Sequence, residues 1–259
     1  MLEDSLSQRL EFAKELALKA GQFALNKRQN QDFHISQKGL NDFVTTADKE
    51  TEQLIFDSIK AKYPKDGFFG EESDSVDGEG RWVVDPIDGT TNYFRNLSNW
   101  AVSIAYEKEE GKPLVGVIYA PSLEALFYAS KDGGAFKNGK EIKVSNIDDF
   151  KYSINVCVPP HRYKDLYSDY MEKFILIGNS SSDLRSYGSC ALELSYIASG
   201  SIDSYYELCL GYYDFAAGKI ILEEAGGSLI YKTNEATGRL DLLATNSKLN
   251  DWYKKNKIF

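Results

Sequence analysis

The sequence predicts an α+β protein, and two observations support this fold class. Two amphipathic helical segments at the start are followed by several short antiparallel strands, and beyond residue 151 strands and helices alternate. At 259 residues the chain is long enough for one large domain or for two closely packed halves. We therefore expect a hydrophobic core that needs neither disulfides nor a structural metal.

Both N-terminal helices are predicted from the spacing of apolar residues. Between Leu6 and Ala24, leucine, alanine and phenylalanine recur mostly at intervals of three or four, the period of one helix face. A second helix is expected to begin between Thr46 and Asp48. It should end before Pro64, because proline cannot supply the backbone hydrogen bond that continues a helix.

From residue 81 the pattern changes to short apolar runs that are typical of strands. A charged turn separates two of these runs and predicts a hairpin, and Asn138-Gly139 is a strong turn signal before the last run. The expected strands cover residues 82–84, 101–106, 114–119, 125–129 and 142–144.

A polar stretch at residues 146–151 is interpreted as the boundary between two halves, residues 1–147 and 148–259. In the second half glycines follow two of the predicted helices, as is common at helix C-termini. The expected strands cover residues 152–158, 204–207, 228–231 and 242–245, and the expected helices cover residues 163–174, 190–198 and 215–224.

Composition and charge exclude several classes of protein. The net charge of -9 argues against a nucleic-acid or anionic-membrane partner, because such surfaces need clustered lysine and arginine. No apolar run reaches the roughly 18 residues of a membrane span, and the acidic N-terminus does not resemble a signal peptide, so we expect a cytoplasmic location. Three widely spaced cysteines and two distant histidines predict neither a disulfide framework nor a zinc site.

The most informative segment is 82–92, where two aspartates stand at the end of a predicted apolar strand. Asp85 is followed by Pro86, which is expected to break the strand ladder, and Asp88 opens a turn toward a short helix. Magnesium prefers oxygen ligands and is usually held by one or two carboxylates together with waters and substrate phosphate. The two aspartates can therefore bind adjacent ions, with Asp85 bridging them.

The residues around these aspartates suit a phosphate group. The Ile87 carbonyl lies between them and can serve as a further ligand. Gly89 lets the backbone approach a phosphate closely, and a helix that begins at Thr90 would offer free N–H groups to an anion. Glu71 and Asp214 are candidates for the same site, although a solvated turn residue and a plain helix cap are their alternatives.

Three segments, in this order, resemble the signature segments of the inositol monophosphatase family: Gly70-Glu-Glu-Ser73, Asp85-Pro-Ile-Asp-Gly-Thr-Thr-Asn92, and Asp214-Phe-Ala-Ala-Gly218 with Glu224-Ala-Gly-Gly227. Shorter matches extend the resemblance from about residue 38 to residue 245. The aspartate–proline segment is very specific to the family. The resemblance implies a layered α/β/α/β/α sandwich of the inositol monophosphatase and fructose-1,6-bisphosphatase type. It also implies a magnesium-dependent phosphatase that lithium inhibits.

For the metals, the resemblance implies a cluster of two or three Mg²⁺ ions. Glu71, Asp85 and the Ile87 carbonyl would hold the ion that activates water. Asp85, Asp88 and Asp214 would hold a second ion beside the leaving oxygen. A weaker third ion would lie near Glu71.

The resemblance also implies roles for the residues around the reacting phosphate. Asp48 and Thr90 would orient the attacking water, with Glu71 acting through its ion. The backbone amides of Gly89 and Thr90 would bind the phosphate. Lys38 would lie in a mobile loop that approaches the third ion.

The alcohol part of the substrate would meet a separate set of residues. The resemblance places Gly188, Ser189 and Cys190 along the substrate pocket beside Asp88 and Asp214, although the family commonly has a small residue such as alanine at the position of Cys190. Tyr213 likewise stands where the family usually has tryptophan. Glu207 would accept hydrogen bonds from substrate hydroxyls, and a surface acid at a strand end is its alternative.

The expected reaction is hydrolysis of a small phosphate monoester by in-line attack of water, with two ions about 3.5–4 Å apart neutralising the attacking and leaving oxygens. A covalent route with Asp85 or Asp88 as nucleophile stays open at this point. The modest length favours a small polyol phosphate, with myo-inositol monophosphate first. The alternatives are a same-fold phosphatase of fructose 1,6-bisphosphate, histidinol phosphate or a 3′-phosphonucleotide, and a non-catalytic regulatory binding protein. Because the family is commonly homodimeric, we also expect a homodimer.

Overall fold

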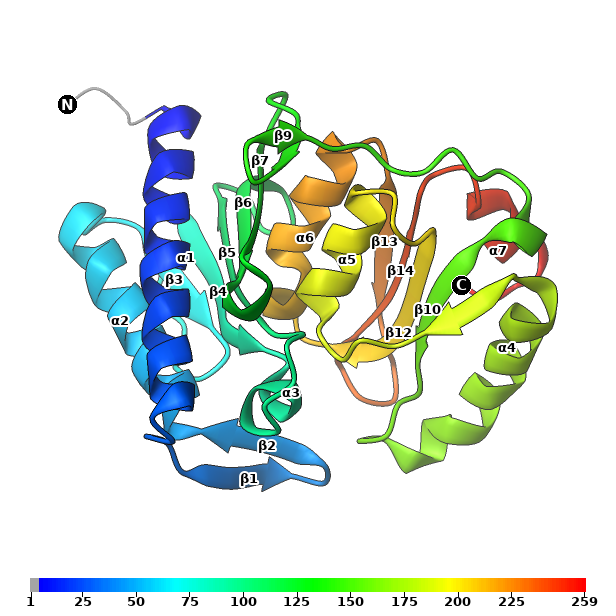
Figure 1. Cartoon of the computed structure of the whole chain (residues 1–259), viewed down its shortest axis with the longest axis horizontal. Helices are drawn as coiled ribbons and strands as arrows, with labels where there is room; N and C mark the ends of the chain where they lie inside the picture. Colours follow the sequence, from blue (N-terminus) through cyan, green and yellow to red (C-terminus); the bar gives the residue numbers. More distant parts are fainter. Residues whose placement is uncertain (1–4) are drawn as a thin grey trace.

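Two helices form the first layer of the molecule. In the computed structural model, which describes residues 5–259, α1 (Leu6–Gln29) and α2 (Thr46–Lys62) cover one face of a seven-stranded sheet (Figure 1). The predicted apolar face of α1 is buried from Ala13 to Ala24. α2 ends just before Pro64, as the sequence predicted.

The seven-stranded sheet follows chain order from β3 to β9 and is antiparallel except for the parallel pair of β3 and β4. The predicted hairpin is confirmed as β5 and β6. The last predicted strand, at 142–144, is wrong, because the chain leaves the sheet once the Ile142 N–H has bonded to the Ala135 carbonyl. The strands are β3 (Gly67–Gly70), β4 (Arg81–Asp88), β5 (Ala101–Glu107), β6 (Pro113–Ala120), β7 (Ala125–Ser130), β8 (Ala135–Lys137) and β9 (Lys140–Glu141).

A small hairpin at the edge of the first half was not predicted. Strands β1 (Ile35–Gly39) and β2 (Asp42–Thr45) pair antiparallel, and the short helix α3 (Thr90–Phe94) packs against β2 (Figure 1). Every residue of β1 is exposed, so no alternation of apolar and polar residues marks it in the sequence.

The central layer holds α5 (Cys190–Ala198) and α6 (Tyr212–Glu224), which lie between the two large sheets (Figure 1). One hydrophobic cluster runs through this layer and joins residues of both sheets, including Phe127, Leu194 and Tyr205. All three cysteines are free and buried.

The second sheet has the order β11-β10-β12-β14-β13, with β10 parallel to both of its neighbours and the other pairs antiparallel. Its strands are β10 (Ile154–Val158), β11 (Asp183–Arg185), β12 (Ser204–Leu210), β13 (Ser228–Thr233) and β14 (Leu240–Thr245).

The last layer consists of α4 (Tyr167–Ser180) and α7 (Asn250–Lys255), which cover the outer face of the second sheet (Figure 1). α4 begins later than the predicted residue 163, because a 3₁₀ turn (Lys164–Leu166) precedes it. The sequence did not predict α7. It is held by apolar contacts such as the stacked rings of Phe150 and Trp252, whose centroids lie 3.5 Å apart.

The layers alternate as helices, sheet, helices, sheet, helices, so the predicted α+β sandwich is confirmed (Figure 1). The predicted boundary between residues 147 and 148 falls between β9 and β10. The division into halves stays a prediction, because α6 from the second half packs against the sheet of the first half. Within residues 5–259, no helix is long and apolar enough to span a membrane.

Candidate active site

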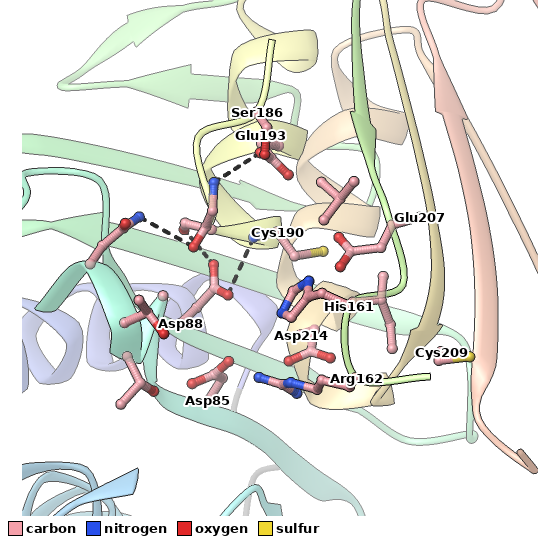
Figure 2. A pocket seen from close by; sticks show the side chains of 18 of the residues that line it. Asp85, Asp88, His161, Arg162, Ser186, Cys190, Glu193, Glu207, Cys209 and Asp214 are labelled. Atoms are coloured by element: carbon pink, nitrogen blue, oxygen red, sulfur yellow. Dashed lines mark hydrogen bonds between the residues drawn. The ribbon is translucent and has the colours of Figure 1, made fainter. Parts of the chain in front are cut away.

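A cleft between the two sheets gathers most of the residues that the sequence singled out. It has a volume of 370 Å³, and β4, α3, α5, β12 and α6 all contribute to its walls (Figure 2). Asp48 and Lys38 do not line the cleft themselves, but each contacts a residue that does: Asp48 accepts a hydrogen bond from Thr90, and Lys38 lies beside Glu71. The predicted site residues that line the cleft are Glu71, Asp85, Ile87, Asp88, Gly89, Thr90, Gly188, Ser189, Cys190, Glu207 and Asp214.

Asp85 and Asp88 both lie in β4, because a β-bulge carries the strand past Pro86. The two aspartates are three positions apart, whereas their partners on β5 are two positions apart, so β4 holds one extra residue here. The ladder is interrupted at Pro86, as the sequence predicted, but pairing with β5 resumes at Asp88 and so the strand does not end there. A bulge leaves one position unpaired, and proline, which has no N–H to donate, fits there. The Asp85 carboxylate is fixed by the Ile87 N–H, which donates to Oδ1 at 3.0 Å.

Gly89 joins the end of β4 to α3 in a conformation that only glycine adopts easily. Its φ is +88°, and its carbonyl accepts the Tyr93 N–H at 2.9 Å to begin the helix. A Cβ atom on Gly89 would lie 3.0 Å from both the Asn99 and the Gly188 carbonyl oxygens. The turn therefore brings the backbones of the two halves into close approach beside the cleft.

Thr90 and Asp48 are hydrogen-bonded, which suits residues that would orient one water molecule together. The Thr90 hydroxyl donates to Asp48 Oδ1 at 3.0 Å and lies 3.2 Å from the Ile87 carbonyl oxygen. The other Asp48 oxygen accepts the Thr45 N–H at 2.8 Å in the capping box of α2. Burial raises the pKa of Asp48 to about 6, against the stabilising hydrogen bonds from Thr45.

Asp88 ties β4 to the first turn of α5. Its carboxylate accepts hydrogen bonds from the Ser189 hydroxyl, the Cys190 N–H at 3.2 Å and the Ala191 N–H at 2.8 Å (Figure 2). Burial and the charge of Asp214 raise the pKa of Asp88 to about 7, and these hydrogen bonds oppose the shift.

Asp214 is the third residue of α6 and not its cap, because the helix begins at Tyr212. The Gly211 N–H donates to Asp214 Oδ2 at 2.6 Å, so the carboxylate reaches back over the start of the helix. Burial raises the pKa of Asp214, although the nearby Arg239 and Arg162 guanidinium groups oppose this. Asp214 is therefore not the N-cap residue itself, but its side chain takes part in the capping box, and the capping alternative stays open.

The three aspartates form one cluster. Oxygen atoms of Asp85, Asp88 and Asp214 lie within 4.8 Å of one another and point into the same space (Figure 2). Burial and the neighbouring carboxylates Glu71, Asp88 and Asp214 raise the pKa of Asp85 well above its usual range. A bound divalent cation would remove this repulsion, and carboxylate oxygens are the ligands that magnesium prefers. The donor set of the cluster therefore fits a divalent cation.

Glu71 lines the cleft but does not belong to this group of three. Its carboxylate lies 3.4 Å from Lys38 Nζ, and Lys38 pairs more closely with the neighbouring Glu72. Lys38 lies on β1 and not in a loop, so that part of our prediction is wrong. Burial raises the pKa of Glu71 to about 8, and the Lys38 charge opposes the shift. The role of Glu71 as a metal ligand stays a prediction.

Cys190 and Glu207 lie on the far side of the cleft from Asp85 (Figure 2). Glu207 is half-buried, and one of its carboxylate oxygens accepts a hydrogen bond from the Tyr205 hydroxyl. The alternative of a surface acid is therefore wrong. Burial and the nearby carboxylates raise the pKa of the Cys190 thiol well above its usual range, so this side chain lines the cleft as a small neutral group.

Several residues that line the cleft were not predicted from the sequence, among them His161, Arg162 and Glu193. The His161 carbonyl accepts the Asn41 side-chain N–H at 3.0 Å, and Arg162 lies 3.2 Å from Asp42, so the β1–β2 hairpin contacts this segment. Two prolines before His161 mark a break after β10 but do not show where the next residues point. Glu193 carried a better signal, because it follows Cys190 by three positions and shares its helix face.

Comparison with known proteins agrees with this geometry. A model of the inositol monophosphatase family matches residues 5–258. The Nus factor SuhB of Escherichia coli K12 is 38% identical over 222 residues, which cover 84% of this chain and 83% of the relative. The inositol-1-monophosphatase of Mesorhizobium japonicum is 34% identical over 237 residues, which cover 90% of this chain and 87% of the relative.

A solved structure of an inositol monophosphatase from Anabaena superposes with a TM-score of 0.83 at 32% identity, covering 98% of this chain and 96% of that one. The match of the family model includes both large sheets and all of the cleft. This chain belongs to the inositol monophosphatase family, a family of phosphatases.

Proposed function

We propose that this chain is a magnesium-dependent phosphomonoesterase of small polyol phosphates, with myo-inositol monophosphate as its preferred substrate. The observation that carries the proposal is the cluster of three carboxylates, within 4.8 Å of one another, on one side of a 370 Å³ cleft. Glu207 on the opposite side supplies an acceptor for hydroxyl groups. A cleft of this volume is large enough for a small ring that carries a phosphate.

The carboxylates would hold two or three Mg²⁺ ions. Asp85, Asp88 and Asp214 would hold one ion. Glu71 and the Ile87 carbonyl would hold another ion, and Asp85 would be a ligand of both. When bound, magnesium would neutralise the charge of the phosphate and lower the pKa of a water molecule. The amides of Gly89 and Thr90 would bind the phosphate where the chain turns from β4 into α3.

Thr90 and Asp48 would handle the proton of the attacking water. Because the Thr90 hydroxyl donates to Asp48 Oδ1 at 3.0 Å, the Thr90 oxygen keeps a lone pair that can accept a hydrogen bond from water. The proton can then pass through Thr90 to Asp48. A pKa of about 6 makes this carboxylate a competent base near neutral pH.

Direct attack by water is favoured over a covalent route through Asp85 or Asp88. Both oxygens of Asp88 accept hydrogen bonds from the start of α5, which reduces their electron density for attack on phosphorus. Asp85 Oδ1 is likewise engaged by the Ile87 N–H. These carboxylates are better suited to binding ions than to forming a phosphoenzyme.

A phosphate-release panel tests the proposal. The substrates are myo-inositol monophosphate, fructose 1,6-bisphosphate, histidinol phosphate, a 3′-phosphonucleotide and an aryl phosphate, each with Mg²⁺, with excess chelator and with millimolar lithium. We expect the highest catalytic efficiency on inositol monophosphate, no turnover in chelator, and inhibition by lithium at saturating substrate. Full activity in chelator would overturn the metal assignment, and a clear preference for another phosphate would overturn the substrate assignment.

Stabilisation by magnesium should increase with pH. In the metal-free protein the pKa values of Asp48, Asp88 and Glu71 are raised to about 6, 7 and 8, above the usual range near 4 of unfolded carboxyl groups. The folded state therefore binds these protons more tightly. This contribution to stability is fully present below about pH 4 and is lost as pH rises toward 8.

Magnesium binds the ionised carboxylates and must displace these protons at low pH. The rise in melting temperature on adding MgCl₂ should therefore be larger at pH 8 than at pH 6. Thermal melts at the two pH values, with and without MgCl₂, measure this difference. Equal shifts at both pH values would contradict the prediction.

Replacing Glu207 by glutamine should change substrate preference. Loss of charge-assisted hydrogen bonds of about 1.5–3 kcal/mol lowers catalytic efficiency on inositol monophosphate about ten- to a hundredfold. An aryl phosphate lacks the hydroxyl groups and should lose much less. Steady-state kinetics on both substrates measures the ratio. Equal losses on the two substrates would instead mean that Glu207 supports the metal cluster or the fold.

A second candidate function, a non-catalytic binding role, is favoured by one observation, the name Nus factor that the Escherichia coli relative carries. The three clustered aspartates favour catalysis, because a binding protein gains nothing from crowding like charges. A wild-type protein that releases no phosphate from any member of the panel would support the binding role. The homodimer, the cytoplasmic location and the absence of a nucleic-acid partner stay predictions.

A further inference from the structure

Asn92 is a buried residue of the aspartate–proline segment to which the proposed reaction assigns no role. It is the third residue of α3 and is 9% exposed at the wall of the cleft. Its Nδ2 donates to the Asn99 carbonyl, to the Tyr187 carbonyl at 2.7 Å and to the Gly188 carbonyl at 3.3 Å. Because all three partners are acceptors, the group that faces them must be the NH₂ of the amide. One side chain therefore joins α3 to the pocket segment, residues 187–189, which leads into α5.

The pocket segment is held from two sides. Asn92 binds the Tyr187 and Gly188 carbonyl oxygens, whereas the N–H groups of the same two residues donate to Glu193 Oε1 at 2.7 and 3.2 Å. Gly188 has φ of +75°, and a Cβ there would lie only 3.1 Å from Asn92 Nδ2, so glycine allows this close approach. Glu193 lies in α5, just beyond the segment, and shapes it locally. Asn92 instead fixes the segment to a distant part of the chain.

Helix α3 does not depend on Asn92 for its own position. The Tyr93 hydroxyl donates to the Ala24 carbonyl in α1 at 2.8 Å. The Thr90 hydroxyl donates to Asp48 in α2 at 3.0 Å. Since α1 and α2 hold α3 through these contacts, loss of the Asn92 amide should release the pocket segment and leave α3 in place.

Asp88 also contacts the pocket segment, but it has a second task. Its carboxylate accepts the Ser189 hydroxyl and the first N–H groups of α5 (Figure 2). A bound cation would use the oxygens of the same carboxylate. The NH₂ of Asn92 cannot bind a cation, so its contacts with the segment are the same with and without metal.

We propose that Asn92 is a positioning residue that holds the pocket segment in register with the phosphate turn, Gly89 and Thr90. Both parts line the cleft, one from α3 and one from the start of α5. When they are in register, the phosphate and the alcohol of one substrate molecule meet their partners together. The Asn92 amide thereby favours a polyol, whose hydroxyl groups contact the pocket side, over an alcohol without such groups. The inference rests on the proposed phosphatase function and concerns the selection of its alcohol.

Asn92→Leu tests the inference, with kcat and KM measured on inositol monophosphate and on an aryl phosphate. The variant keeps the branched shape of the side chain, adds no charge and removes both N–H donors. We expect the ratio of catalytic efficiencies, inositol over aryl phosphate, to fall about tenfold. Inhibition by inorganic phosphate, which probes the phosphate turn without the pocket segment, should keep its wild-type strength.

Asn246→Leu is the matched control. Asn246 is 1% exposed, and its Nδ2 likewise joins distant segments, because it donates to the Ser145 hydroxyl at 2.9 Å and to the Ile147 carbonyl at 2.8 Å. It does not line the cleft. Both variants should melt a few degrees lower than the wild type, whereas Asn246→Leu should keep the wild-type ratio.

Asn92→Ser provides a second test if Asn92→Leu does not fold. Its hydroxyl keeps one donor for the carbonyls, so the variant should fold and lower the ratio by less. An unchanged ratio in a folded Asn92 variant would overturn the inference. Equal losses on both substrates would also overturn it, because Asn92 would then support the phosphate turn or the fold as a whole. Either result leaves the phosphatase function intact, whereas a wild-type protein without turnover on either substrate would overturn both.

Discussion

Replacing Asp85 by asparagine is expected to abolish turnover while the fold stays intact. Asp85 is buried at the β4 bulge, and an asparagine of the same shape can still accept the Ile87 N–H. The substitution removes one of three clustered charges and the only carboxylate proposed to contact both ions. We expect kcat to fall by about three orders of magnitude, the loss seen when one preorganised electrostatic group is removed from a site.

The same variant should change stability in a diagnostic direction. Without metal, Asp85→Asn removes repulsion from Glu71, Asp88 and Asp214, so its melting temperature should equal or exceed that of the wild type. With MgCl₂ it should gain little, because a ligand is missing. Phosphate release, calorimetric Mg²⁺ binding and thermal melts measure these effects. Asp57→Asn, at an exposed position of α2, is the control and should match the wild type. Wild-type turnover in Asp85→Asn would remove the aspartate cluster from the mechanism.

Replacing Gly89 by alanine should lower the catalytic efficiency strongly but the melting temperature only slightly. Left-handed backbone costs a non-glycine residue about 1–2 kcal/mol, and the new Cβ would crowd the Asn99 and Gly188 carbonyl oxygens at 3.0 Å. The turn must shift, and with it the amides proposed to bind the phosphate. A displacement of about 1 Å at a reacting group can lower the rate about a hundredfold, which is the loss we expect in catalytic efficiency.

Gly139→Ala is the matched control for this experiment. Gly139 also has a left-handed backbone, with φ of +80°, but a Cβ there would meet nothing within 4 Å, and it lies outside the cleft. Both variants should melt a few degrees lower than the wild type, whereas only Gly89→Ala should lose activity. If Gly139→Ala loses as much activity, the effect of Gly89→Ala reflects general destabilisation and not the phosphate turn.

Local chemistry made much of the site predictable from the sequence. An apolar strand that ends in Asp85 and Asp88, followed by Gly89, predicted a carboxylate turn that opens a helix, and α3 begins at Thr90 as expected. Helix α5 also has the predicted bounds. These features depend on neighbours within a few residues, where apolar spacing, caps and turn residues determine the backbone.

Other elements could not be predicted, because their local sequence carries no signal. All of β1 is exposed, and so Lys38 could not be placed on a strand. Helix α7 is short and is held by distant rings such as that of Phe150. The bulge at Pro86 forms because β5 pairs with β4 on both sides of it, and β5 begins at Ala101, 13 residues after Asp88 in the chain.

The sequence by itself determined which side chains were available for catalysis and which short segments would present them. Only the tertiary structure decided which of them meet. Asp214 approaches Asp88 because α6 packs between the two sheets, and Glu193 and Glu207 line the same cleft because β12 runs beside α5. The physical reason is that periodicity shows which face of an element is buried but not what it packs against. Contacts between residues far apart in the chain are set by the packing of whole layers.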